Sequence, residues 1–335
     1  VLDDGSAIAF GRHLGGQINI PDLGTNKVLS AAAGGEHTVL VLLDGSIAPR
    51  GVWSLLGQNV LHRSTQTLIW RKESDNLEVA TLCPRDALYM KINELWRRTA
   101  KSSQNLTRIE VLSAPHMEQS LKGYFGKVES NRANIHSPFN PPNPGTPGWI
   151  EAHGTAHAAP ADWHAGLSKL RESFLDLGHT TRANFVLSWH GSNFANRYGI
   201  AQGGLEPFRF TDGGYFAAGS YTSLNAAYAS EYSEYSAPGP TGEYAVLLVA
   251  TCVGCAYVIT RGEDYPNPLD YSSVSKFYSS DPELSKAILP KYDTHFIPVK
   301  DAYDNQACSA GEATAFEIVS RETSQCCPIA ICYYS

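Results

Sequence analysis

Three short segments of the chain carry residue types that suit ligand binding and group transfer. The first is Trp189-His190-Gly191-Ser192, where an apolar run ends on a tryptophan and is followed by a titratable ring beside a glycine. Histidine offers one nitrogen donor and one acceptor to a hydroxyl-rich ligand, and glycine lets the backbone approach an amide closely. We expect this strand end to bind a ligand, and interpret a second His-Gly pair, His153-Gly154, as a chance occurrence because it follows a Pro/Gly loop.

The second segment is tyrosine-rich. "GSYTSLNAAYASEYS" places Tyr221 shortly after a glycine, and its helix-like continuation puts Tyr228 and Tyr232 four residues apart on one face. Two tyrosines that face one cleft can sandwich a flat aromatic ligand, with stacking worth about 1 kcal/mol per ring beyond burial. The alternative is a Tyr/Ala-rich helix that packs by its aromatic stripe, and the residues alone leave both open.

The third segment is "SAGEATAFEIVS", in which we expect Glu312 to begin a short strand. A carboxylate at the mouth of a strand can stabilise an adjacent cationic centre or orient a sugar hydroxyl. An exposed charge at a sheet edge is the alternative interpretation.

The elements that must position these residues follow from periodicity after about residue 80. Helical spacing of apolar residues predicts helices within 84–99, 115–128 and 163–178, the last ending at Gly178. Strands are predicted at 105–112, 185–191, 243–253, 255–260, 294–300, 313–319 and 328–334. A few helices followed by a run of strands indicate an α+β domain with an antiparallel sheet.

The N-terminal segment has a different pattern. Asp4-Gly5-Ser6 returns as Asp44-Gly45-Ser46 forty residues later, between short alternating runs. Such a period is typical of propeller or solenoid repeats, and the segment resembles the repeats of regulator-of-chromosome-condensation type β-propellers. We expect residues 1–52 to be a propeller-like repeat fragment, all-β and part of a longer array or packed on its neighbour, with 53–79 a linker and 80–335 the main domain.

Composition narrows the class of protein. The chain has 335 residues and a net charge of −7, which gives no reason to expect general binding to nucleic acid or anionic membranes. No run of 18 apolar residues occurs, so we expect a soluble protein, and the start at Val1 suggests a fragment or a processed product. Seven cysteines favour reduced, buried thiols in the cytoplasm or nucleus, and we interpret Cys252-x-x-Cys255 as core rather than as a metal or redox site.

In their order and spacing, the three segments resemble the ADP-ribosyltransferases of the poly(ADP-ribose) polymerase and diphtheria-toxin type. His190 precedes Tyr221 by 31 residues and Tyr232 follows Tyr221 by 11, as in that family's His-Gly-Ser/Thr, Gly-x-Tyr and second tyrosine. Glu312 precedes "FEI" as the family's glutamate precedes a similar segment of a late strand. The resemblance covers about residues 80–335 and implies an antiparallel two-sheet core with flanking helices, which binds NAD⁺ as substrate and needs no metal.

The resemblance also implies a role for each site residue. Gly191 would clamp the nicotinamide carboxamide through its backbone, Tyr221 and Tyr232 would sandwich the ring, and Tyr228 is the alternative stacking residue. His190 and Ser192 would bind the adenine-side ribose. Catalysis would rest on Glu312, with His190 and Tyr221, because the carboxylate would stabilise the charge that develops as nicotinamide leaves.

One departure keeps a second hypothesis open. Many family members have a serine three residues before the second tyrosine, where this chain has Ala229. An inactive NAD or ADP-ribose binding module, or a scaffold, is therefore the alternative to a transferase, and NAD hydrolysis without transfer is a third. We expect a protein acceptor, the chain itself included, with nucleic acid left open and no membrane partner; mono- and poly-transfer are not distinguished.

Overall fold

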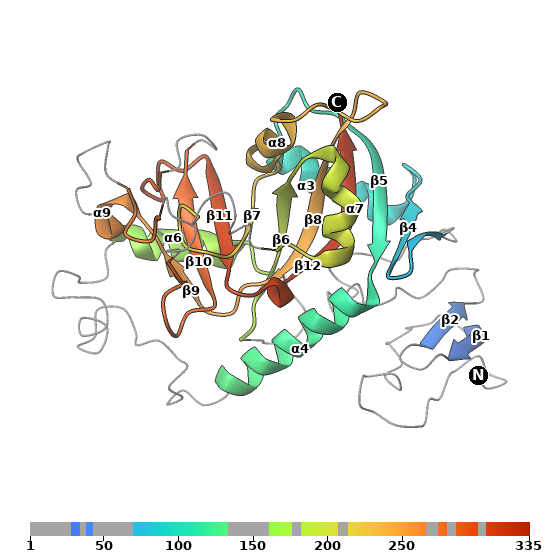
Figure 1. Ribbon diagram of the computed structural model, residues 1–335, viewed down its shortest axis with the longest axis horizontal. Helices are drawn as coiled ribbons and strands as arrows, with labels where there is room; N and C mark the ends of the chain where they lie inside the picture. The colour runs from blue at the N-terminus through green and yellow to red at the C-terminus, as the bar shows by residue number, and fades with distance from the viewer. Residues whose placement is uncertain are drawn as a thin grey trace.

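The protein is described by a computed structural model that covers residues 70–132, 161–175, 182–206, 214–265, 274–279, 286–300 and 306–335, and the backbone of 28–33 and 38–42 (Figure 1). In the N-terminal segment, β1 (Val28–Ala33) and β2 (Thr38–Leu42) form a two-stranded antiparallel sheet. Both Asp-Gly-Ser repeats lie outside the described residues, as do His153 and Gly178. The propeller assignment is therefore not confirmed and stays a prediction.

The main body is α+β and is built on one mixed sheet of ten strands. Every pairing in this sheet is antiparallel except that of β9 with β10. The strands lie in the order β3 (Arg71–Ser74), β4 (Leu77–Thr81), β5 (Leu106–Ser113), β12 (Cys326–Tyr334), β8 (Tyr244–Cys252), β6 (Phe185–Gly191), β7 (Ser220–Ser223), β11 (Ala315–Ser320), β10 (Thr294–Val299) and β9 (Ala256–Val258). The expected α+β class is confirmed, whereas the two-sheet arrangement is not.

The sheet is nearly interrupted between β6 and β7. These strands share one paired position, Trp189 with Ser223, whereas β6 pairs with β8 along its whole length. A separate hydrophobic cluster packs on each side of this junction, one including Trp96 and Trp189 and the other Phe216 and Phe296. The strand end at His190 and Gly191 therefore lies where the two halves of the sheet begin to separate.

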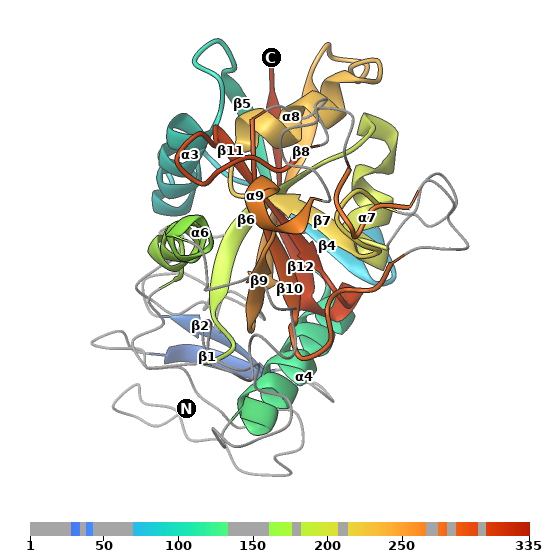
Figure 2. The same cartoon turned by 90° about the vertical axis from the view of Figure 1, so that its left-hand side faces the viewer.

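Helices cover both faces of the strands. Figure 2 shows α3 (Ala87–Thr99) and α6 (Ala161–Glu172) on one side and α7 (Arg197–Gly203) on the other, with α8 (Ala226–Glu234) above. The remaining helical elements are α4 (Pro115–Arg132), α9 (Arg261–Asp264) and the 3₁₀ turns η1 (Phe194–Asn196) and η3 (Thr323–Gln325). In α3, Leu88, Ile92 and Trp96 are buried as the periodicity predicts, and Asp86 caps the helix by accepting from the Leu88 amide at 2.8 Å.

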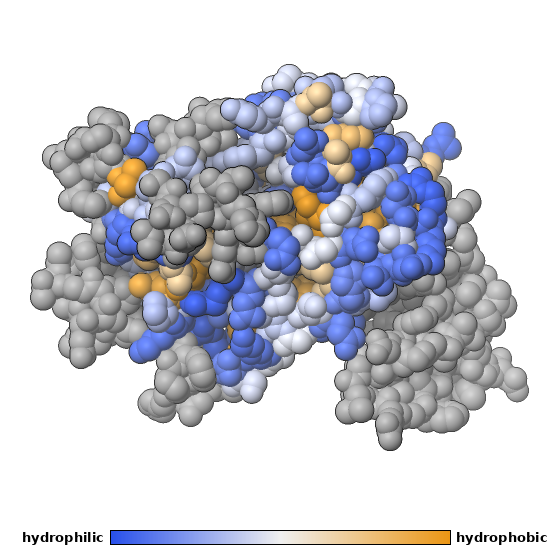
Figure 3. All heavy atoms as spheres, in the orientation of Figure 1, coloured by the Kyte–Doolittle hydropathy of each residue, from blue (hydrophilic) through white to orange (hydrophobic). Residues whose placement is uncertain are grey.

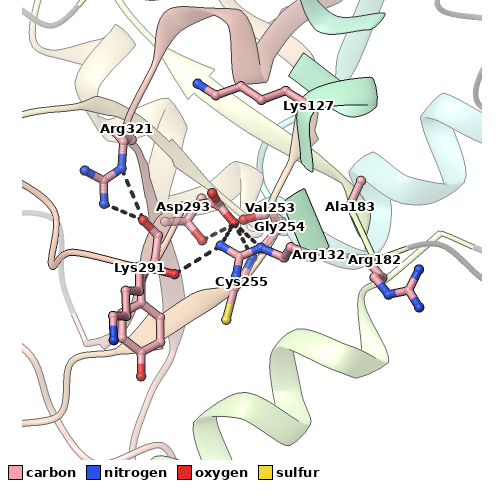
Figure 4. A network of polar contacts seen from close by, with 12 residues as sticks. Lys127, Arg132, Arg182, Ala183, Val253, Gly254, Cys255, Lys291, Asp293 and Arg321 are labelled. Carbon is pink, nitrogen blue, oxygen red and sulfur yellow. Dashed lines mark hydrogen bonds and ion pairs between the residues drawn. The ribbon is translucent and has the colours of Figure 1, made fainter. Parts of the chain in front are cut away.

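Helix α4 contacts the half of the sheet that contains β10. The contact is made through Asp293, which directly precedes β10 (Figure 4). Arg132, at the end of α4, donates to Asp293 Oδ2 from Nη2 at 2.6 Å and from Nε at 3.1 Å. The same carboxylate accepts from the backbone amide of Cys255 at 2.8 Å and from the Tyr124 hydroxyl at 3.2 Å. One buried ion pair therefore connects α4, the turn between β8 and β9, and the start of β10.

The structure also bears on the expected boundaries and cysteines. Strands β3 and β4 begin before residue 80, so the sheet includes part of the segment 53–79 that was expected to be a linker. All seven cysteines are free thiols, and Cys83 is exposed rather than buried. Burial raises the pKa of Cys252, and that of Cys255 to about 11. Cys252 is a core residue as expected, whereas Cys255 is half-buried and packs against the core. Within the described ranges, no helix has the length and apolar character needed to cross a membrane.

Candidate functional site

A cavity of about 740 Å³ opens at the junction of β6 and β7. Its walls come from the end of β6, from η1 and α7, from residues 203–206 and 214–219, and from β7, α8 and β11. This volume is in the range of small-molecule and cofactor sites. In the orientation of Figure 1, the space-filling view shows apolar side chains near the centre between hydrophilic surfaces (Figure 3). The weak pairing of β6 with β7 thus leaves room for a ligand between the two halves of the sheet.

His190 lines this cavity from the end of β6. Its Nδ1 lies 2.8 Å from the backbone carbonyl oxygen of Tyr221. A carbonyl only accepts hydrogen bonds, so Nδ1 carries the proton and Nε2 is left as an acceptor. Burial lowers the pKa of His190, against the opposing effect of that hydrogen bond, so the ring is neutral near pH 7. A neutral imidazole with a fixed tautomer suits the binding of a ligand hydroxyl.

Gly191 lines the cavity beside His190, and the structure gives a packing reason for the glycine. A Cβ at this position would lie 1.7 Å from the backbone oxygen of Ala229 on α8. Any side chain would therefore force α8 away from β6. Ser192, the other member of the motif, is half-buried just beyond β6 and is not among the residues that line the cavity.

All three predicted tyrosines line the cavity. The Tyr221 hydroxyl accepts from the Phe216 amide at 3.0 Å and donates to the Ala217 carbonyl at 2.7 Å, so it holds the wall while its ring faces the cavity. On α8, the hydroxyls of Tyr228 and Tyr232 lie 3.4 Å apart, and their rings meet edge to face at 5.7 Å. Tyr228 is buried, whereas Tyr232 is 43% exposed.

The structure does not place Glu312 in this site. Glu312 lies in a turn before β11, its side chain is 62% exposed, and it forms an ion pair of 3.0 Å with Lys300. It is therefore the exposed charge that the alternative interpretation described. Two other glutamates line the cavity: Glu206, which is exposed, and Glu317, which is buried in the middle of β11, five residues after Glu312.

Glu317 is only 5% exposed. Burial raises the pKa of Glu317 to about 7, and the neighbouring Tyr228 hydroxyl opposes that rise. On β11 it lies opposite Ser223 of β7 and Ile297 of β10. Sequence reasoning missed it, although a carboxylate in the apolar strand "AFEIV" was a signal, because an ionisable side chain is rarely buried without a partner or a task.

His295 supports the cavity wall from β10, and no sequence motif pointed to it. This fully buried ring is within 2.8 Å of the Phe216 carbonyl at Nδ1, and its Nε2 accepts from the Leu289 amide at 3.0 Å. Burial lowers the pKa of His295 to about 3, so the ring is neutral and its tautomer is fixed. It holds a tight loop in which Gly214 and Ala217 have φ of 77° and 97°.

The site thus combines aromatic rings, a neutral histidine acceptor and one buried carboxylate. Rings can stack on a flat base or a pyridinium, and a carboxylate nearby stabilises positive charge that develops on a ligand. Among the described residues, no three histidine, cysteine or acidic side chains gather as a metal site would need.

No family model matches the chain, and no curated protein matches it. The geometry of the site and the resemblance of its motifs are therefore what support a function.

Proposed function

We propose that the protein is an NAD⁺-dependent ADP-ribosyltransferase, a glycosyltransferase that cleaves the bond between nicotinamide and ribose. The observation that supports this most is that His190, Tyr221, Tyr232 and one strand-borne glutamate, Glu317, line the same cavity. These positions span more than a hundred residues of sequence. The sequence motifs alone point to the histidine and the tyrosines.

Each residue then has a role that its environment allows. The rings of Tyr221 and of Tyr232 or Tyr228 would stack on nicotinamide, beside the backbone of Gly191. His190 Nε2 would accept a hydrogen bond from the adenine-side ribose. Glu317, rather than Glu312, would bind the hydroxyl of the nicotinamide-side ribose and stabilise the oxocarbenium-like charge as nicotinamide leaves.

Ala229 weakens this site but does not remove it. It lines the cavity where the resemblance leads us to expect a serine, and it cannot donate to the nicotinamide carboxamide. A missing neutral hydrogen bond costs about 0.5–1.5 kcal/mol, a loss of affinity that the stacking rings would partly offset.

The test compares two glutamates of the same segment. Glu317→Gln keeps the shape of the side chain but removes its charge, so we expect NAD⁺ affinity to be retained and kcat to fall by about 10²–10³-fold. Glu312→Gln is the matched control and should transfer at the wild-type rate, because its carboxylate lies outside the cavity. Equal turnover of the wild type and Glu317→Gln would refute the role of Glu317.

Labelled NAD⁺ separates the alternatives. A transferase leaves label on an acceptor after denaturing electrophoresis, and a hydrolase releases nicotinamide without labelling anything. A binding module, the reading that Ala229 favours, would retain intact NAD⁺ or ADP-ribose and do neither. Retained NAD⁺ with no chemistry would therefore replace the transferase proposal with a reader.

A further inference from the structure

Thr222, on β7, carries a buried hydroxyl without a hydrogen-bond partner. The residue is 3% exposed, its Oγ1 is shielded from solvent, and that oxygen makes no hydrogen bond to any of the described residues. Such groups are rare in folded proteins, because burial removes the hydrogen bonds of a hydroxyl to water and the fold normally replaces them. Thr222 also lines the cavity, so a bound ligand is the available partner for its hydroxyl.

Thr222 lies beside His190. Trp189 of β6 pairs with Ser223 of β7 in antiparallel register. The next residues, His190 and Thr222, therefore lie opposite each other, with their side chains on the same face. The position of the His190 ring agrees with this, because its Nδ1 lies 2.8 Å from the carbonyl oxygen of the peptide bond that joins Tyr221 to Thr222. That hydrogen bond leaves Nε2 of the same ring as an acceptor for a ligand.

Two other hydroxyl side chains near His190 are not available to a ligand in the cavity. Ser192, to which the resemblance assigns a ribose contact, is half-buried beyond the end of β6 and does not line the cavity. Ser220 does line it, but its hydroxyl already donates to the Leu205 carbonyl. Of these three hydroxyl residues, Thr222 is therefore the one with an unused hydroxyl in the cavity.

We propose that Thr222 takes the place of Ser192 as a ligand-binding residue, and that Thr222 and His190 together bind a ribose whose two hydroxyls are both free. This inference rests on the proposed NAD⁺-dependent function and specifies its substrate further. One ribose hydroxyl donates to Nε2 of His190. The neighbouring ribose hydroxyl forms a hydrogen bond with Oγ1 of Thr222, which can both donate and accept.

The same pair of residues disfavours a ribose that carries a phosphate. A phosphate dianion only accepts hydrogen bonds, so it has no proton to donate to Nε2, and a nearby cation is needed to compensate its charge. Within the part of the chain that the structure describes, no lysine or arginine lines the cavity, whereas the exposed Glu206 does. We therefore expect the site to bind NAD⁺ in preference to NADP⁺, whose adenine-side ribose carries a 2′-phosphate.

Thr222→Val tests the contact because it removes the hydroxyl and nearly keeps the shape of the side chain. Calorimetry in a Glu317→Gln background, which prevents turnover, should show that the Kd for NAD⁺ rises by about five- to tenfold. Thr222→Ser keeps the hydroxyl and should stay within about threefold of the parent. Ser192→Ala is the matched control and should stay within about twofold, because its hydroxyl lies outside the cavity.

NAD⁺ analogues identify the group that Thr222 contacts. The 2′-deoxy and 3′-deoxy forms of the adenosine ribose each lack one hydroxyl. For the analogue that lacks the partner of Thr222, the parent and Thr222→Val should bind equally, because the contact is absent from both complexes. A loss that persists undiminished with both analogues would show that Thr222 does not contact the ribose, and would overturn the proposal.

Thermal unfolding without NAD⁺ supplies a readout that separates binding from a structural role. A buried hydroxyl without a partner destabilises the fold, so Thr222→Val should have a Tm equal to or above that of the wild type. A Tm lower by about 3 °C or more would show that the hydroxyl already has a partner within the chain, which contradicts the proposal.

The proposed function and this inference fail differently. If neither the wild type nor Glu317→Gln binds NAD⁺, the proposed function fails, and the inference fails with it. If NAD⁺ binds, the inference alone fails when Thr222→Val binds as tightly as its parent, when Ser192→Ala loses as much affinity, or when NADP⁺ binds as tightly as NAD⁺. A loss in Thr222→Val that Thr222→Ser restores, and that disappears with one deoxy analogue, supports the inference.

Discussion

At the scale of single residues, Glu317 is the most informative side chain of the site. It occupies a buried position in an apolar strand and is 5% exposed, and the neighbouring Tyr228 hydroxyl opposes the rise of its pKa. An ionised carboxylate there costs stability, because burial penalises the charge more than one hydroxyl compensates it. A residue that weakens the fold in this way needs another reason to be present, and the charge stabilisation that we propose for glycosidic cleavage would be such a reason.

The pH dependence of stability measures that cost. The pKa of Glu317 is about 7 in the folded chain, against an ordinary value of 4.5 that the unfolded chain would show. Between these values the unfolded chain binds fewer protons, so the free energy of unfolding should fall as pH rises from about 4.5 to 7, by on the order of 3 kcal/mol. Urea unfolding of the wild type and Glu317→Gln across this range measures the difference.

Glu317→Gln has no charge to bury, so its unfolding free energy should lack that component of the fall. Glu312→Gln should keep it, because Glu312 is exposed. Parallel curves for the wild type and Glu317→Gln would contradict the raised pKa.

At the scale of elements, α7 is the cavity wall whose anchoring is clearest. Gly199, Ile200 and Gly203 of α7 line the cavity, while Tyr198 points its hydroxyl the other way and donates to Glu110 at 2.8 Å. Glu110 is buried in β5 and also accepts from the Tyr333 hydroxyl at 2.7 Å. The hydrogen bond to this carboxylate therefore fixes α7 against β5 and β12.

Removing the hydrogen bond between Tyr198 and Glu110 should destabilise the packing of α7 without creating a cavity in the core. Tyr198→Phe deletes one donor to a buried carboxylate, so we expect the free energy of unfolding to fall by about 1–2 kcal/mol in urea titrations. Tyr235→Phe makes the same chemical change on an exposed ring and should stay within about 0.5 kcal/mol of the wild type. Equal stability of the two variants would mean that α7 does not depend on Glu110.

Most elements were predictable because their apolar residues repeat with the period of a helix or a strand. Strands β5, β6, β8, β10, β11 and β12 and helices α3, α4, α6 and α8 lie where the sequence predicted them. Short elements carried no such signal. β3 and β7 have four residues each and α7 has seven, too few for a period to be distinguished from local composition.

At the scale of the whole molecule, the two halves of the sheet need ties besides the single paired position of β6 and β7. The ion pair of Arg132 and Asp293 is one of them, because it connects α4, which packs in the first hydrophobic cluster, with the start of β10 in the second. The Arg132 side chain is 8% exposed and that of Asp293 16%, so each charge depends on the other for compensation.

Asp293→Ala would leave the guanidinium buried without its carboxylate. We expect the free energy of unfolding to fall by about 3–5 kcal/mol in urea titrations, close to what breaking a buried pair costs. Lys127→Met is the control on the same helix, since the ion pair of Lys127 with Glu322 is solvent-exposed and worth about 1 kcal/mol or less. Losses of similar size in both variants would show that Asp293 is not a tie between the halves.

The sequence by itself determined the α+β class, most of the long elements, and the His190, Tyr221, Tyr228 and Tyr232 set that lines the cavity. It could do so because periodicity and short motifs are local properties of the chain. Only the tertiary structure decided that ten strands form one mixed sheet and that its weak junction opens the cavity. These features depend on pairings between strands far apart in sequence.

The same dependence on tertiary structure decides which of two glutamates, Glu312 or Glu317, lines the cavity. Glu312 and Glu317 are five residues apart in "SAGEATAFEIVS", and spacing along the chain favoured the first. The strand begins at Ala315, however, so Glu312 remains in the solvated turn while Glu317 faces the cavity beside α8. Where a strand begins and which of its faces meets a neighbour are set by the packing partners, and the local sequence does not contain them.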